Sequence, residues 1–126
     1  MKSEMIGGLR ACEIMSREPV VAREDDTIGA VMKTLMQRKI TGVPVVSAAG
    51  VLCGIVTERD LLLQHSLVTW VSDVMTREVF TAEPETGIDD LARILLENSI
   101  KRVVIVQDGR PVGIVSRRDI LRARLP

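Results

Sequence analysis

The chain has 126 residues, which is enough for one domain or for two very small units and excludes a multidomain enzyme. Apolar residues make up 46% and charged residues 27%, so the composition is that of a folded globular protein and not of a disordered segment. Basic and acidic residues number 17 each, and Trp70 and Phe80 are the only aromatic residues, which excludes a broad basic nucleic-acid surface and a base-stacking platform.

The N-terminal stretch, residues 1–16, lacks the apolar core of a signal peptide. No apolar stretch approaches the roughly 20 residues that span a bilayer, and we therefore expect a cytoplasmic protein without membrane association. Cys12 and Cys53 form no CxxC motif, and His65 has no second histidine at metal-binding spacing, so no metal site is predicted. Two buried free thiols are the favoured reading of the cysteines, and a redox pair is the alternative.

The chain contains an internal repeat. Residues 15–62 align with residues 75–121, so that Met15 meets Met75, Gly54 meets Gly113 and Asp60 meets Asp119. Each copy starts with a short extended run, at residues 20–22 and 79–81. A helix follows in each, with apolar residues at i, i+3, i+4, i+7 and i+8. These positions are Ile28, Val31, Met32, Leu35 and Met36 in the first copy, and Ile88, Leu91, Ala92, Leu95 and Leu96 in the second.

Asp26 and Thr86 are the predicted N-caps of these two helices. Two β-rich runs follow each helix, at 43–46 and 51–56 in the first copy and at 103–106 and 111–115 in the second. Turns at 48–50 and 108–109 join the runs, and a short helix closes each copy.

The repeat predicts an α+β fold made of two β-α-β-β-α units. A unit of about 50 residues buries too little surface to be stable alone, so we expect the two to pack with pseudo-twofold symmetry into one body. The predicted divisions are an N-terminal segment with repeat 1 at 1–63, a short packed linker at 64–72, and repeat 2 at 73–126.

Two aligned motifs are the candidate sites: Thr57-x-x-Asp60 and Ser116-x-x-Asp119. In each, a strand ends in a hydroxyl residue and a helix begins with a carboxylate three residues later. This spacing is typical of a capping box that only satisfies free N–H groups at a helix start. It also fits a binding site in which the hydroxyl and the helix start contact phosphate and the carboxylate accepts from a ribose diol. Arg59 and Arg118 favour the second reading, because a bare cap does not require them.

The chain resembles a tandem pair of CBS domains, a Bateman module, over nearly its whole length. The residues that carry the resemblance are GIVTERD and GIVSRRD, ITGVPVV and IKRVVIV, and IMSREPVVA and VMTREVFTA. The resemblance implies a non-catalytic regulatory module that binds AMP, ADP, ATP, S-adenosylmethionine or, in some members, NAD in clefts between the repeats. It also implies a homodimer that needs no cofactor and controls an effector protein in trans.

The resemblance also implies which residues bind the ligand. One cleft would use Thr57, Arg59, Asp60, Val79, Phe80, Ile100, Lys101, Arg102 and Val103. The other would use Ser116, Arg118, Asp119, Val20, Val21, Ile40, Thr41, Gly42, Val43 and Pro44. In this reading the two aspartates hold ribose, the hydroxyls and arginines face phosphate or sugar, and the aliphatic residues sandwich the base.

Other readings remain open. Lys101 and Arg102 favour phosphate in the first cleft, and Glu58 partly offsets this advantage, so one site, two sites or no occupied site are all compatible with the sequence. An enzyme is disfavoured, because the nucleotide, zinc and serine-hydrolase motifs are missing and general acids and bases are few. A ligand-independent dimerisation or interaction module is the alternative function, with Met32 and Met36 as candidates for an adaptable interface.

Overall fold

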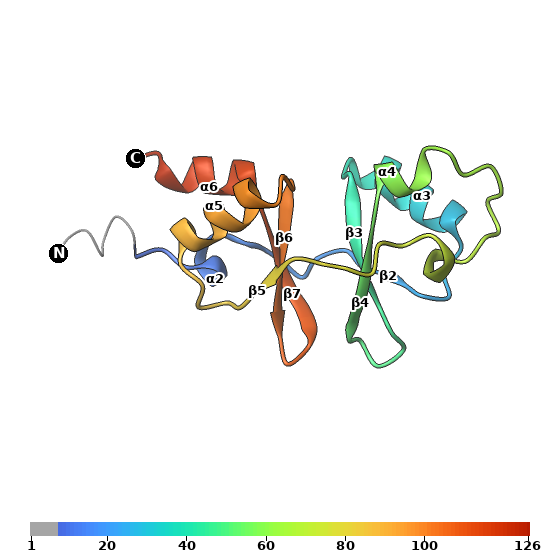
Figure 1. Ribbon diagram of the computed structural model, residues 1–126, viewed down its shortest axis with the longest axis horizontal. Helices are drawn as coiled ribbons and strands as arrows, with labels where there is room; N and C mark the ends of the chain where they lie inside the picture. The colour runs from blue at the N-terminus through green and yellow to red at the C-terminus, as the bar shows by residue number, and fades with distance from the viewer. Residues whose placement is uncertain (1–7) are drawn as a thin grey trace. The chain divides into compact units, whose positions relative to one another are not determined.

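The computed structural model describes residues 8–126, which form two compact units (Figure 1). The central unit is Val20–Val79. The terminal unit combines the described residues up to Pro19 with Phe80–Pro126. Each unit contains one complete β-α-β-β-α copy, so the predicted α+β class and the predicted order of elements are confirmed.

The central unit has a three-stranded sheet of order β2-β3-β4, in which β2 pairs in parallel with β3 and β3 pairs antiparallel with β4. Helices α3 and α4 lie on the same side of this sheet (Figure 1). The elements are β2 (Ala22–Arg23), α3 (Ile28–Arg38), β3 (Gly42–Val46), β4 (Leu52–Thr57), α4 (Glu58–Leu61) and the 3-10 turn η1 (Val71–Asp73).

The terminal unit has a four-stranded sheet of order β1-β7-β6-β5. Strand β5 runs parallel to β6, and the pairs β6–β7 and β1–β7 are antiparallel. Asp108 and Gly109 both have positive φ, as a two-residue hairpin turn between β6 and β7 requires. The elements are α2 (Ala11–Ile14), β1 (Ser16–Arg17), β5 (Thr81–Ala82), α5 (Ile88–Glu97), β6 (Arg102–Gln107), β7 (Arg110–Ser116) and α6 (Arg117–Arg124).

The N-cap of the main helix lies one residue later in each unit than the sequence predicts. Helix α3 begins after Thr27, whose Oγ1 accepts from the backbone N–H three residues on at 3.2 Å. Helix α5 begins after Gly87. The caps predicted at Asp26 and Thr86 are therefore wrong. Each of these side chains accepts instead from the backbone N–H three residues before it, at 2.8 and 3.1 Å, and so closes the turn that precedes the helix.

Each unit has its own hydrophobic core. The cores consist of the buried face of the main helix and the buried residues of the sheet, and the central helix residues are Ile28, Val31 and Leu35, with Ile88, Leu91 and Leu95 as their counterparts. Met36 and Leu96, predicted to continue these buried faces, are exposed. The apolar stripe is therefore narrower than the periodicity predicts.

A short segment at the start of each copy packs on the last strand of the other copy. Thr76 forms a β-bridge with Ile55 in the central unit, and β1 pairs with β7 in the terminal unit. Glycines make this close approach possible, since a Cβ on Gly54 would lie 2.6 Å from the sulfur of Met75. Met15 covers Gly113 in the same way. Residues 8–19, predicted as part of the first division, consequently belong to the terminal unit, and residues 73–79, predicted as part of repeat 2, belong to the central unit.

The segment predicted as a linker, residues 64–72, packs against the start of α3 through its backbone. The N–H groups of Ile28 and Gly29 donate to the carbonyls of Thr69 and Leu67 at 2.9 and 3.0 Å. Val71 is fully buried, whereas Leu67 and its apolar neighbours Val68 and Trp70 are exposed. This connection is held by backbone hydrogen bonds and by the buried Val71. The side chains of Leu67, Val68 and Trp70, on which the prediction of a packed linker was based, do not hold it.

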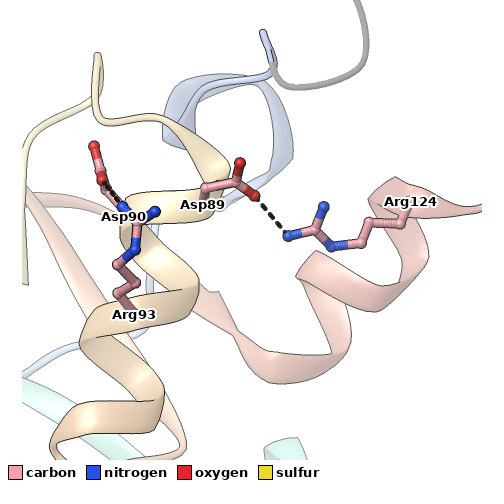
Figure 2. Close-up of polar contacts among 4 residues, drawn as sticks. All are labelled: Asp89, Asp90, Arg93 and Arg124. Atoms are coloured by element: carbon pink, nitrogen blue, oxygen red, sulfur yellow. Dashed lines mark hydrogen bonds and ion pairs between the residues drawn. The ribbon is translucent and has the colours of Figure 1, made fainter. Parts of the chain in front are cut away.

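Exposed ion pairs lie in the helical layer of the terminal unit. Arg124 of α6 contacts Asp89 at the start of α5 at 2.9 Å, and Arg93 contacts Asp90 within α5 at 2.9 Å (Figure 2). The first pair joins residues far apart in the chain and both of its side chains remain substantially exposed, so its contribution to stability is small.

Candidate functional site

The first candidate motif lies where β4 ends and α4 begins. Asp60 Oδ2 accepts from the backbone N–H of Thr57 at 2.8 Å and from its hydroxyl at 3.3 Å. The other oxygen, Oδ1, accepts from the hydroxyl of Thr76 at 2.9 Å. The carboxylate is thus fixed at the helix start by three donors from one unit.

The second candidate motif has the same arrangement between β7 and α6. Asp119 Oδ2 accepts from the backbone N–H of Ser116 at 2.8 Å, and the Ser116 hydroxyl accepts from the Asp119 N–H at 3.2 Å. Oδ1 contacts the guanidinium of Arg122 at 3.0 Å. The Asp119 side chain is only 13% exposed. Both motifs are therefore capping boxes, as their spacing allows, and both hold a carboxylate in a defined orientation.

Two arginines distinguish these turns from plain caps. Arg59 and Arg118 each lie in the first turn of the helix and are exposed. Within residues 8–126, neither guanidinium forms a hydrogen bond or an ion pair. An exposed guanidinium two residues after a hydroxyl residue at a helix start is well placed to attract a phosphate.

Within each unit, the turn adjoins the first residues of the middle strand. Gly42 pairs with Thr57, and Glu58 donates to the carbonyl of Thr41 at 3.0 Å. The prediction assigned Thr41 and Gly42 to one ligand and Thr57 to the other. The structure places them side by side in the central unit, where β3 begins and β4 ends.

The terminal unit repeats this neighbourhood with basic residues. Arg102 pairs with Ser116. Arg117 donates from its backbone N–H to the carbonyl of Lys101 at 3.3 Å and from Nε to the carbonyl of Ile100 at 3.0 Å. The terminal turn therefore has two cationic neighbours where the central turn has Thr41 and Gly42, and it is the more attractive of the two for an anion.

A small surface pocket of about 90 Å³ opens in the central unit between α3 and the sheet. It includes the predicted residues Val21 and Val43. Its other lining residues are Ala22, Asp26, Ala30, Val31 and Thr34, none of which the motif analysis selected. The repeat alignment could have indicated this pocket. It aligns Ala30 and Thr34 of the first copy with Asp90 and Ile94 of the second, so the two units differ in side-chain size and charge at these positions.

The remaining predicted residues divide by burial. Pro44 and Val103 are buried in the strands of their own units, so they offer a ligand little more than backbone. Val20 and Ile40 are partly buried against the central core, and Ile100 is partly buried against the terminal one. Val79 and Phe80 are half-buried, and the carbonyl of Phe80 accepts from the N–H of Val104 at 3.2 Å.

Both cysteines are free thiols and half-buried. The Cys53 thiol donates to the carbonyl of Val45 at 3.4 Å, and burial, followed by the nearby Glu24 carboxylate, raises the pKa of this thiol. No group of three or more potential metal ligands occurs in the described part of the chain. Among residues 8–126, no helix has the length and apolarity needed to cross a membrane.

The CBS-domain family matches this chain twice, at residues 11–64 and 71–126, and the chain belongs to this family as a tandem CBS pair. CBS pairs are regulatory modules, and the relatives that are enzymes have other domains for catalysis. An uncharacterized protein of Methanocaldococcus jannaschii, MJ1426, is 29% identical, with 97% of this chain and 95% of the relative covered. The chain spans only 23% of the inosine-5′-monophosphate dehydrogenase of the same organism, to which it is 32% identical.

Two solved structures of similar proteins contain adenosyl ligands. CBSX2 in complex with AMP is 27% identical with a TM-score of 0.84, over 92% of this chain and 96% of CBSX2. The CBS pair of MJ0100, in complex with 5′-methylthioadenosine and S-adenosylmethionine, is 32% identical with a TM-score of 0.81, over 90% and 94% of the two chains.

Proposed function

We propose that this chain is a non-catalytic regulatory module that binds an adenosyl ligand, such as AMP, ADP, ATP or S-adenosylmethionine, and thereby controls a partner protein. The observation that carries the proposal is the pair of strand–helix turns, each with a fixed carboxylate and an arginine that pairs with no group among residues 8–126. The AMP and S-adenosylmethionine complexes of similar CBS pairs support the choice of ligand class.

Each turn supplies groups for the sugar and the phosphate. Asp60 and Asp119 accept from ribose hydroxyls, and their caps hold them in place before the ligand arrives, which lowers the entropy lost on binding. Arg59 and Arg118 then balance the phosphate charge, and Lys101 adds a second cation beside the terminal turn.

The base is held without aromatic stacking. In the central unit, Val21 and Val43 line the pocket beside α3, and Ala30 leaves it open because its side chain is a single methyl group. The terminal unit has Asp90 at the aligned position, where the carboxylate pairs with Arg93. We therefore place the preferred adenine contact at the central pocket.

Substitution of the two carboxylates tests this function, with AMP as the probe in isothermal titration calorimetry. Asp60→Asn and Asp119→Asn keep the shape of the caps and remove the charge that the diol needs. Asp89→Asn is the matched control, because Asp89 is also an aspartate in an ion pair with an α6 arginine but lies outside both turns (Figure 2). We expect the combined Asp60→Asn and Asp119→Asn variant to lose AMP binding and the control to retain it. Equal affinity in the two proteins contradicts the site.

A second candidate function, ligand-independent self-association, is favoured by one observation. Large apolar side chains are exposed at aligned positions of both repeats, namely Met36 and Leu96 on the main helices and Leu62 and Leu121 on or beside the short ones. Their exposed fractions run from 64% to 78%, so each leaves most of its apolar surface uncovered. Sedimentation equilibrium of Leu62→Asp combined with Leu121→Asp tests it: a lower mass than the wild type supports assembly through these side chains, and an unchanged mass contradicts it.

A further inference from the structure

The carboxylates of the two candidate turns differ in the partner of their Oδ1 oxygen. Asp60 Oδ1 accepts from the neutral hydroxyl of Thr76 at 2.9 Å, whereas Asp119 Oδ1 contacts the cationic Arg122 at 3.0 Å. The residue aligned with Thr76 is Ser16, which is exposed in β1. Thr76 was not among the predicted ligand-binding residues, because it lies 16 residues after Asp60 in the sequence.

The Asp60 carboxylate has few acceptor directions left for a ligand. A carboxylate offers about four lone-pair directions, and three donors already use the Asp60 carboxylate. A ribose diol brings two further donors, so one present donor must leave. The Thr57 hydroxyl has the longest of the three hydrogen bonds, at 3.3 Å, and it also belongs to the residue expected to face phosphate or sugar. The Thr57 N–H and the Thr76 hydroxyl therefore remain.

We propose that Thr76 is a positioning residue, which orients the Asp60 carboxylate so that its two free lone pairs face a ribose diol. This proposal rests on the proposed function. With one donor on each oxygen, the Thr57 N–H on Oδ2 and the Thr76 hydroxyl on Oδ1, rotation about the Cβ–Cγ bond of Asp60 is blocked. Each oxygen then keeps one acceptor direction for one hydroxyl of the diol.

The backbone around Thr76 holds it in place independently of its side chain. Its N–H donates to the Ile55 carbonyl at 2.9 Å, and its carbonyl accepts from the Ile55 N–H at 2.8 Å. Met75, the residue before it, is buried over Gly54. The Thr76 side chain is mostly exposed, so Thr76→Val removes the hydroxyl without changing the fold, and Thr76→Ser keeps the hydroxyl on a smaller side chain.

The ligand test compares AMP with 2′,3′-dideoxy-AMP, which lacks the diol, in an Asp119→Asn background so that only the Asp60 site is observed. We expect Thr76→Val to weaken AMP binding about tenfold, as the loss of support for one charged hydrogen bond implies, and to leave dideoxy-AMP binding unchanged. Thr76→Ser should restore AMP binding. An equal loss for both ligands would show that Thr76 acts on the fold alone and would overturn the proposal.

A ligand-free measurement separates this proposal from the proposed function. If Thr76 orients Asp60, Thr76→Val also weakens the hydrogen bond from the Thr57 N–H to Asp60. We expect amide hydrogen exchange at Thr57 to become several-fold faster in Thr76→Val and to remain at the wild-type rate in Thr76→Ser, while Ser116 exchanges at the same rate in all three proteins. Unchanged exchange at Thr57 overturns the role of Thr76. Faster exchange at Thr57 in Thr76→Val, together with a wild-type protein that binds no AMP, overturns the proposed function and leaves the orienting contact supported.

Discussion

The close contact of Met75 with Gly54 makes a sharp prediction about stability. A Cβ at residue 54 would lie 2.6 Å from the Met75 sulfur and 3.0 Å from the carbonyl oxygen of Thr76. The sulfur belongs to a buried side chain, and the carbonyl is hydrogen-bonded to Ile55, so neither neighbour moves freely. Gly54→Ala therefore overpacks this position, and we expect it to lower the free energy of unfolding by about 2 kcal/mol.

Urea unfolding followed by circular dichroism measures this loss, and Gly87→Ala is the matched control. No atom lies within 4 Å of a Cβ at Gly87, and neither glycine has a positive φ, so Gly87→Ala adds a methyl group without overpacking and costs only the exchange of a glycine N-cap for alanine. For a chain of this length, 2 kcal/mol corresponds to a fall in Tm of about 8 °C. In a Met75→Ala background, the added cost of Gly54→Ala should fall by half or more. A Gly54→Ala loss within about 0.5 kcal/mol of the control would refute the reasoning.

Two further predictions concern the core and the thiol. Leu91→Ala, at a fully buried position of α5, should destabilise the protein by about 2–5 kcal/mol in urea unfolding, whereas Leu96→Ala on the exposed side should cost well under 1 kcal/mol; equal losses would contradict the assignment of the buried face. The raised pKa of Cys53 favours the protonated thiol in the folded state. In Cys12→Ser protein, the rate of alkylation of Cys53 by iodoacetamide should therefore reach its midpoint at a higher pH than in the urea-unfolded chain. The stability that the protonated thiol contributes should be lost as the pH rises through the folded-state midpoint. A midpoint equal to that of the unfolded chain would contradict this.

Much of the fold follows from local patterns that occur twice. The β-rich runs at 103–106 and 111–115, together with Asp108 and Gly109 between them, predict the hairpin of β6 and β7, and the apolar periodicity that starts at Ile88 predicts α5. Repetition added strength, because each weak pattern has a counterpart at the aligned position. Family resemblance then provided the ligand class, which composition and spacing alone leave open.

Other features depend on contacts between distant parts of the chain and could not be predicted from local patterns. Thr76 reaches Asp60 because Met75 packs over Gly54, and only the pairing of Met15 with Gly113 in the aligned copy hints at this. The caps were misplaced because Asp26 and the neighbouring Thr27 are both good N-cap residues, and the register of the turn decides between them. Met36 fits the apolar periodicity, yet no layer of its own unit covers it.

Direct binding of small molecules to the wild-type protein is the most direct test of the account. Isothermal titration calorimetry with AMP, ATP and S-adenosylmethionine, and with GMP as the guanine control, measures both affinity and stoichiometry. We predict saturable binding of at least one adenosyl compound, accompanied by about 2.7 kcal/mol of stabilisation at 100 times its dissociation constant, and weaker binding of GMP. Absence of binding by every adenosyl compound to folded protein would contradict the assignment of a ligand-binding regulatory module.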